Sequence, residues 1–187
     1  MDGPRRCPWV RLNNPLYVRY HDEEWSRPCR DDGQLYELLI LECFQAGLSW
    51  ECVLNKREAF RRAYDGFDPE KVAAYGEEKR AALLADPGII RNRRKVDASI
   101  RNSRVFLEIR AEFGSFARYL WGFTRGKSLR EDCTLRTSSP LSDEISRDLR
   151  RRGMSFVGTT IVYSYLQAAG VLSAHAEGCF LCEGEAP

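Results

Sequence analysis

The sequence predicts an all-α fold in a single domain. Apolar residues recur at helical spacing along most of the 187-residue chain, whereas the period-two alternation typical of half-buried strands is almost absent. The composition, with 43% hydrophobic and 30% charged residues, is that of a globular protein and excludes a disordered chain. A chain of this length buries one sizeable core. We therefore expect one helical domain over residues 1–187, built as one or two lobes and without a sheet.

Capping residues and helix breakers set the boundaries of the predicted helices. Gly47 ends the first helix, and Ser49 caps the next one. Asp68 is an N-cap followed by proline at the first helical position, and Pro87–Gly88 forces a turn before a long basic helix. The predicted helices cover residues 34–46, 49–64, 69–75, 77–85, a long helix that opens at residues 91–95, and residues 142–153. Arg150–Arg152 in the last turn of the final helix match the preference of a helix C-terminus for cations.

The longest uncharged stretch, residues 154–174, is interpreted as a buried helix and not as a membrane span. Serine, threonine, glutamine and glycine residues interrupt it, whereas a spanning helix is more uniformly apolar. Residues 1–7 contain no apolar run of the kind found in signal peptides. We therefore expect a cytoplasmic protein with no membrane partner. Its seven scattered cysteines are then expected to be reduced, and a cysteine with a function is expected to bind metal.

The net charge of +2 creates no overall field that demands a nucleic-acid partner, but the charge is unevenly distributed. Six basic side chains and one acidic side chain lie between residues 91 and 104. The turn Asp86–Pro87–Gly88 precedes this basic band, so its backbone N–H groups and the nearby cations could bind phosphate groups. The candidate DNA-contacting residues of this hairpin are Gly88, Ile89, Arg91, Arg93 and Lys95. The alternative is an ordinary helix–helix connection with a solvated charged face.

Two cysteines and two histidines near the chain ends form a candidate metal site. Cys7 and His21 lie near one terminus, and His175 and Cys179 lie near the other. The last two are four residues apart, so one helical turn would direct both toward the same point. Two thiolates and two imidazoles suit a closed, tetrahedral structural zinc. Cys182 is a rival ligand, and the alternative reading is a pair of satisfied histidines with buried free thiols.

Glu42 is the strongest candidate for a functional side chain. It falls on the same side of its helix as Leu35 and Leu38, where a carboxylate is costly unless it is paired or kept for a ligand. Its candidate aromatic neighbours are Trp9, Tyr17, Tyr20 and Trp50. An anion among ring faces suits a flat cationic ligand, because the rings attract the charge and the carboxylate accepts N–H donors. The alternative is a glutamate that pairs with an arginine while the aromatic residues fill the core.

With these residues in place, the chain resembles the DNA-3-methyladenine glycosylase I family of the helix-hairpin-helix glycosylase superfamily. The matching stretches are residues 7–9, 15–25, 41–50, 88–93, 156–161, 163–164 and 167–168, and they close at His175 and Cys179. The resemblance implies a DNA-repair enzyme that hydrolyses the N-glycosidic bond of 3-methyladenine in alkylated double-stranded DNA. It also implies that the base is flipped into a pocket, and that no lyase activity accompanies hydrolysis.

The resemblance assigns roles to particular residues. It makes Glu42 the base-binding and catalytic residue, with pocket walls formed by Trp9, Tyr17, Tyr20 and Trp50. The turn Gly47, Leu48, Ser49 corresponds to the element that approaches the gap left in the duplex, and the hairpin near residues 77–104 corresponds to the backbone-binding motif. A structural zinc would be held by Cys7, His21, His175 and Cys179. We expect a monomer, because a flipped base occupies a single pocket.

Three departures from the family pattern modify these expectations. Ser26 stands where glycine is usual, which predicts an altered turn near the metal site, and Arg94 adds charge to the hairpin. Ser173–Ala174 replace a typical Asn-Asp pair, whose carboxylate could orient the zinc histidine, so weaker metal affinity is predicted. Two other functions stay open: a non-catalytic zinc-stapled DNA-binding protein, and a glycosylase retuned to a different cationic or modified base.

Overall fold

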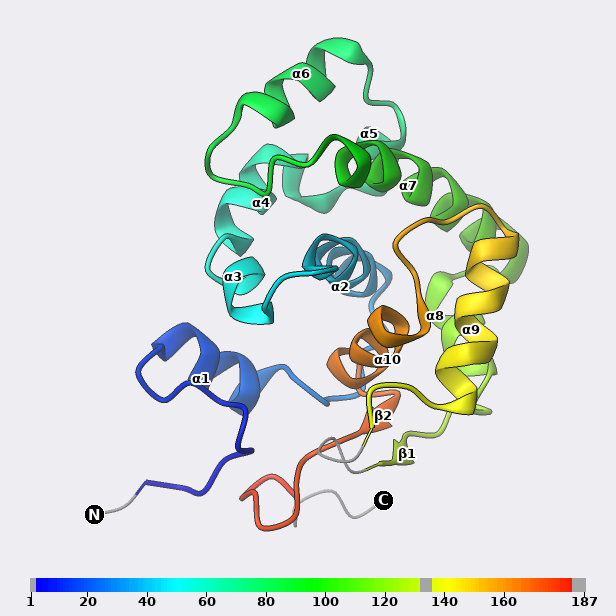
Figure 1. Cartoon of the computed structure of the whole chain (residues 1–187). Helices are drawn as coiled ribbons and strands as arrows, with labels where there is room; N and C mark the ends of the chain where they lie inside the picture. The colour runs from blue at the N-terminus through cyan, green and yellow to red at the C-terminus, as the bar shows by residue number, and fades with distance from the viewer. Residues whose placement is uncertain (1–2, 132–135, 183–187) are drawn as a thin grey trace.

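The computed structural model describes residues 3–131 and 136–182. Within these ranges the chain is almost entirely helical, as predicted, with a chain path shown in Figure 1. The helices are α1 (Pro15–Glu23), α2 (Asp32–Gln45), α3 (Trp50–Leu54), α4 (Arg57–Ala63), the 3-10 helix η1 (Asp65–Phe67), α5 (Pro69–Ala73), α6 (Glu77–Ala85), α7 (Arg93–Phe113), α8 (Phe116–Gly122), α9 (Pro140–Arg151) and α10 (Thr159–Ala168).

Side-chain caps explain where most of these helices begin. The predicted caps Ser49 and Asp68 accept hydrogen bonds from backbone N–H groups of the first turns of α3 and α5. Asn92 does the same for α7, so Arg91 precedes the helix that it was expected to open. Ser139 caps α9 in a capping box, and this helix therefore begins slightly earlier than predicted.

Two predicted helices are shorter or divided in the structure. The stretch 49–64 is broken at Asn55 and Lys56 into α3 and α4. The Lys56 ammonium donates to the carbonyls of Pro87 and Gly88, so the break places this side chain against the distant hairpin. In the stretch 154–174 only α10 is helical, because Phe156 adopts a left-handed φ of 58° before it and Gly170 one of 68° after it.

The expectation of no sheet is wrong in one small respect. Strands β1 (Leu129–Arg130) and β2 (Leu172–Ser173) form a two-stranded parallel pair, in which Leu129 is opposite Leu172. Each strand has only two residues, so no alternation of polar and apolar positions could reveal it in the sequence.

Helix α2 forms the centre of the molecule, between α7 on one side and α10 on the other (Figure 1). Nine of its fourteen residues are buried, and Glu42 is one of them. The first and last described segments lie together, since the Phe180 N–H donates to the Arg5 carbonyl at 2.8 Å. In the described ranges, every helix is too short or too polar to cross a bilayer.

Candidate functional site

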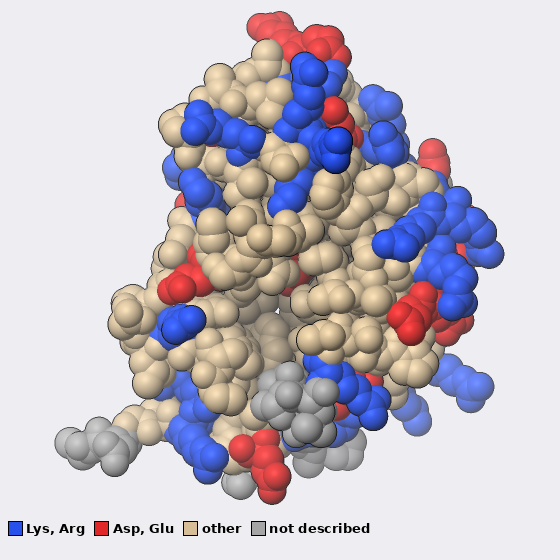
Figure 2. All heavy atoms as spheres, in the orientation of Figure 1, with Lys and Arg blue, Asp and Glu red and all other residues tan. Residues whose placement is uncertain are grey.

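A cavity of about 150 Å³ lies where α1, α2, α3 and α10 meet. Its lining residues are Trp9, Tyr17, Tyr20, Trp25, Glu42, Gln45, Trp50, Ser164 and Gln167. The structure thus brings together the glutamate and all four aromatic residues that the sequence singled out. Figure 2 shows a hollow between these elements, with Lys and Arg side chains gathered above it over α6 and the start of α7.

Glu42 is buried in this cavity without a counter-charge. Its side chain is 2% exposed, and burial raises its pKa to about 8. Within the described part of the chain, three buried polar atoms of the cavity have no hydrogen-bond partner: Glu42 Oε2, Gln45 Oε1 and Trp50 Nε1. Each such atom costs about 1–3 kcal/mol, so a ligand that pairs with them gains correspondingly. The alternative reading, a Glu42–Arg salt bridge, finds no support among the described ion pairs.

Aromatic rings form the walls around this carboxyl group. The Tyr20 and Trp50 ring centroids are 5.3 Å apart with an interplanar angle of 43°. The Trp9 and Tyr17 ring centroids are 5.4 Å apart. Burial, with the nearby Glu42 charge, raises the pKa of Tyr20 well above its ordinary value, so its hydroxyl remains a neutral donor. A flat ring with N–H donors, and above all a cationic one, matches these walls and the unpartnered oxygens.

Four cavity residues were not nominated as site residues from the sequence: Trp25, Gln45, Ser164 and Gln167. Ser164 and Gln167 are three residues apart on α10 and therefore share one helix face. Two polar residues at that spacing within the uncharged stretch 154–174 were the sequence signal that could have indicated a polar site on this helix. Trp25 gave no comparable signal, since its position depends on the turn that follows α1.

A larger hollow of about 340 Å³ lies on another side of Tyr20. Four of its charged groups pair with one another: Arg57 donates to Glu24 and Glu37, and Arg61 also donates to Glu37. Because these charges are mutually satisfied, this hollow has less to offer a polar ligand than the smaller cavity.

The four predicted metal ligands form one buried cluster. The ligand atoms of Cys7, His21, His175 and Cys179 all lie within 4.8 Å of one another. Cys7 Sγ is 3.6 Å from His175 Nδ1, and Cys179 Sγ is 3.5 Å from His21 Nε2. In a tetrahedral site with ordinary Zn–S and Zn–N bonds the sulfur–nitrogen separation is about 3.6 Å, so the donor set fits a zinc ion. The helical turn expected around His175 and Cys179 is wrong, because an irregular turn brings them together.

Residues around the cluster orient its ligands. His21 Nδ1 lies 2.7 Å from an Asp22 carboxylate oxygen, and Arg6 holds the same carboxylate with two donors. This arrangement directs His21 Nε2 to the cluster, as a carboxylate does for many zinc histidines. The rival Cys182 lies outside the cluster and accepts a hydrogen bond from Arg130 at 2.7 Å.

Ser26 takes the left-handed conformation in which glycine is favoured, with φ of 65°. Its buried hydroxyl donates to the Leu172 carbonyl and accepts from the Ala174 N–H. The serine therefore ties the turn after α1 to the segment that carries His175. These hydrogen bonds offset the strained backbone that the departure from glycine introduces.

Two tryptophans connect the Cys/His cluster to the cavity. The Trp9 ring packs edge-on against His21 at 5.3 Å, and the Trp25 ring packs edge-on against His175 at 4.9 Å. Both rings also line the cavity. The cluster therefore supports one wall of the cavity from behind.

The turn between α2 and α3 presents an apolar side chain beside the cavity. Gly47 has φ of +77°, and Leu48 is 42% exposed between the cavity residues Gln45 and Trp50. Ser49 accepts a hydrogen bond from the Cys52 N–H and so begins α3. An exposed leucine on a fixed turn suits the expected approach to a gap in the duplex.

The hairpin between α6 and α7 is well defined. The Asp86 carboxylate accepts from the Gly88 N–H at 2.7 Å. Ile89 is buried and its N–H donates to the Asp86 carbonyl at 3.5 Å, whereas Arg91 and Arg93 are exposed at the start of α7. This end of α7 therefore presents two cations to the solvent, and their contact with phosphate groups stays a prediction.

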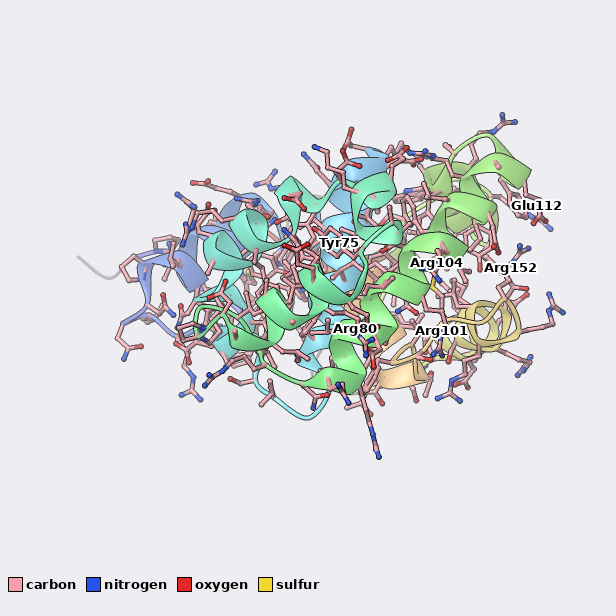
Figure 3. The ribbon with its side chains drawn as sticks, turned by 90° about the horizontal axis from the view of Figure 1, so that it is seen from above. Tyr75, Arg80, Arg101, Arg104, Glu112 and Arg152 are labelled. Carbon is pink, nitrogen blue, oxygen red and sulfur yellow. The ribbon has the colours of Figure 1, made fainter. Side chains whose placement is uncertain are left out.

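The rest of the expected basic band does not form one surface. Lys95 is buried and donates to the Phe44 and Ala46 carbonyls at the end of α2, so its ammonium faces the protein in this structure, and the phosphate contact expected of it stays a prediction. Farther along α7, Arg101 donates to Ser155 Oγ and Arg104 to the Ala73 carbonyl; both are labelled in Figure 3. Successive side chains of an α-helix point in different directions around its axis. The basic residues that are close together in the sequence of α7 therefore lie on several faces of the helix.

The structure contains a second helix–turn–helix besides the α6–α7 hairpin. It is formed by α9, residues 152–158 and α10, which pack against each other. Asn102 fixes the connection by a pair of hydrogen bonds with the Ser155 backbone. The first turn of α10 has no side-chain cap, so its backbone N–H groups are available to an anion.

The chain matches the family model described as methyladenine glycosylase over residues 9–182. It is 43% identical to DNA-3-methyladenine glycosylase 1 of Escherichia coli (strain K12), over 97% of this chain and 99% of that protein. It is 35% identical to the DNA-3-methyladenine glycosylase of Haemophilus influenzae, over 93% of this chain and 96% of that protein.

A crystal structure of 3-methyladenine DNA glycosylase I superimposes with a TM-score of 0.90 at 44% identity, covering 94% of this chain and 98% of that one. A Staphylococcus aureus enzyme solved for the structural basis of 3-methyladenine recognition gives 0.89 at 34% identity, over 94% of this chain and 95% of that one.

Proposed function

The chain belongs to the methyladenine glycosylase family, and we propose that it removes 3-methyladenine from alkylated double-stranded DNA by hydrolysis of the N-glycosidic bond. As a member of that family it is a DNA-repair glycosylase. The proposal adds that the damaged base is flipped into the cavity around Glu42, that hydrolysis is not followed by strand cleavage, and that the enzyme acts as a monomer.

The observation that carries the proposal is the set of unpartnered polar atoms among aromatic rings. Glu42 Oε2 and Gln45 Oε1 can each accept a hydrogen bond, and Trp50 Nε1 can donate one, but none of the three has a partner among the described residues. A methylated purine offers a flat ring, N–H donors and acceptor nitrogens in one plane. Such a ring would satisfy atoms that the empty cavity leaves unpaired, and the neighbouring ring faces of Tyr20 and Trp50 favour positive charge.

The chemistry needs little from the protein beyond binding. Methylation of adenine at N3 places a positive charge on the base and weakens its bond to the sugar, so departure of a neutral base requires no strong acid. A cationic base in the cavity favours the ionised form of Glu42, whose negative charge then stabilises the base. As the bond breaks, water adds to the sugar carbon and releases its proton to the solvent, and the base leaves as neutral 3-methyladenine. A damaged base also pairs and stacks less well, so its extrusion costs less than that of an intact adenine. Leu48 would occupy the space that the extruded base leaves.

Zinc is proposed as a structural ion held by Cys7, His21, His175 and Cys179. Four protein ligands leave no open position, so the bound ion would join the chain ends and supply no catalytic water. The DNA backbone is proposed to contact the exposed side chains of Arg91 and Arg93, and to pass the backbone of Gly88 and Ile89, whose N–H groups pair with Asp86 in the free protein.

The test is release of free base from methylated duplex DNA, with the products separated by chromatography. We expect the wild-type protein to release 3-methyladenine, and Glu42→Ala to reduce the single-turnover rate by about 100-fold or more. Glu58→Ala is the matched control, because that carboxylate is exposed and pairs only with Arg61 among the described residues. Alkali treatment of the product should cleave at abasic sites that the enzyme itself leaves intact.

Other outcomes would identify the other functions. Binding of duplex DNA without release of any base would indicate a non-catalytic DNA-binding protein. Release of a different base from a panel of damaged substrates would indicate a retuned glycosylase. Full activity of Glu42→Ala would refute the assigned role of that residue.

A further inference from the structure

Lys95 lies inside the protein although its neighbours in sequence are on the surface. Its side chain is 7% exposed, whereas Arg93 and Arg94, just before it on α7, are exposed. The Lys95 ammonium donates to the Phe44 carbonyl at 2.7 Å and to the Ala46 carbonyl at 2.6 Å. Phe44 lies in the last turn of α2 and Ala46 is the C-cap residue that follows it, about fifty residues before Lys95 in the sequence.

The end of α2 needs these donors. The last carbonyls of a helix have no partner within the helix, and α2 has no basic residue in its last turn. The chain leaves α2 at Ala46 and turns at Gly47. In this turn the Leu48 N–H donates a hydrogen bond to the Gln45 carbonyl at 2.6 Å. Lys95 donates to the carbonyls of Phe44 and Ala46, the residues on either side of Gln45. Its positive charge also suits the negative end of the helix dipole.

The segment held by Lys95 carries several parts of the site. Glu42 and Gln45 lie in the last turn of α2 and reach into the cavity. Leu48 projects from the turn that follows, and Trp50 begins α3 beside it. One buried ammonium therefore fixes the carboxyl group, the exposed leucine and one aromatic wall relative to α7.

We infer that Lys95 is a positioning residue that locks the end of α2 and the Gly47–Ser49 turn to α7. The cavity and the DNA-facing start of α7 then form one rigid unit, so that a backbone held at Arg93 presents its damaged base at the cavity. Asn102 lies seven residues after Lys95, on the same face of α7, and binds Ser155 in the α9–α10 connection. The inference rests on the proposed function and replaces the phosphate contact that the sequence predicted for Lys95.

The salt dependence of DNA binding separates positioning from phosphate contact. The variants are Lys95→Met, which keeps the apolar stem, Arg93→Met as a reference for a phosphate contact, and Lys71→Met as an exposed control. Removal of one phosphate contact lowers the slope of log affinity against log salt by about one. We expect that change for Arg93→Met only. For Lys95→Met we expect an unchanged slope and a single-turnover excision rate at saturating DNA at least about tenfold lower. A slope lowered by one with a normal rate in Lys95→Met would overturn the inference.

A second measurement does not depend on excision. Hydrogen exchange of the backbone amides in residues 44–52 should become about tenfold faster in Lys95→Met, with little change in α8 and α9. Unchanged exchange there would also overturn the inference. If no protein in the series releases a base, the proposed function fails, and exchange still decides the role of Lys95. If Lys95→Met does not fold, Lys95→Gln, which keeps a shorter N–H donor, is measured in the same way.

The route of the effect is tested by combining substitutions. If Lys95 acts through the position of Leu48, then Lys95→Met should lower the excision rate less in a Leu48→Ala background than in the wild type. Additive losses would instead show that the two residues act independently, and would refute this route.

Discussion

The cavity and the Cys/His cluster lie on opposite sides of the same tryptophan rings, but their polar atoms are in opposite states. In the cluster each thiol and imidazole lies close to another ligand, and His21 is oriented by Asp22. In the cavity three polar atoms lack partners within the described residues, and burial raises the pKa of Glu42 to about 8. The four ligand groups of the cluster are close enough to share one metal ion. The cavity retains unpartnered polar groups that a ligand could satisfy.

This contrast gives opposite expectations for substitutions in the two regions. Removal of a polar group should destabilise the protein at the cluster and stabilise it at the cavity. The two regions also share Trp9 and Trp25, so a change in that common wall should affect both.

The largest expected effect is loss of a metal ligand. Cys179→Ser should abolish zinc binding and lower the melting temperature by more than about 10 °C, because metal binding contributes to folding. Thermal denaturation with metal analysis by mass spectrometry measures both quantities. Cys182→Ser in the same segment is the control and should retain the metal. A protein purified without metal and with unchanged stability after chelation would contradict the structural role.

The next effect has the opposite sign and depends on pH. A carboxyl group with a raised pKa binds its proton more tightly in the folded state, so its contribution to stability falls as pH rises from 4.5 to about 8. Glu42→Gln should therefore raise the free energy of unfolding slightly near pH 5 and by roughly 3–5 kcal/mol at pH 9. Chemical denaturation across this pH range measures the difference between variant and wild type.

Glu37→Gln serves as the control for that measurement. Its carboxylate accepts hydrogen bonds from Arg57 and Arg61, so its removal should destabilise the protein at neutral pH. If the difference in unfolding free energy between Glu42→Gln and the wild type did not change with pH, the pKa of Glu42 would not be raised by burial.

The shared wall gives a smaller effect on both regions. Trp25→Phe should lower the unfolding free energy by about 1–2 kcal/mol and weaken binding of free 3-methyladenine several-fold, since the ring contacts His175 and lines the cavity. Tryptophan fluorescence titration and thermal denaturation measure the two effects. Trp121→Phe, buried in α8 away from both regions, should lower stability and leave base affinity unchanged. If Trp25→Phe bound free 3-methyladenine as tightly as the wild type, Trp25 would have no role in base recognition.

The smallest effect on stability is expected at Leu48. Because this side chain is 42% exposed, Leu48→Ala should change the unfolding free energy by less than about 0.5 kcal/mol. The same change should slow excision from duplex DNA about tenfold, since the gap left by the base is no longer filled. Leu12→Ala, at a leucine that is 71% exposed, is the control for both measurements. Normal excision by Leu48→Ala would exclude this residue from the opening of the duplex.

Much of the site could be predicted from the sequence because its residues are chemically unusual where they stand. A carboxylate on the apolar face of a helix made Glu42 a candidate, and the scarcity of histidine made His21 and His175 candidates; the resemblance to the family then assigned their roles. Ser164 and Gln167 were missed because two neutral polar residues in a long uncharged stretch resemble ordinary interruptions of a helix. The strand pair was missed because two residues are too few to form a pattern.

The sequence by itself determined the helical character, the caps at Ser49 and Asp68, and the residue types able to bind a metal or a cationic ring. These properties depend on local spacing and intrinsic chemistry. Only the tertiary structure decided that Lys95 faces inward to two carbonyls while Arg93 remains outside, and that Trp25 serves both the cluster and the cavity. Which side of a helix meets a distant segment depends on the packing of elements far apart in sequence, and local periodicity does not contain that information.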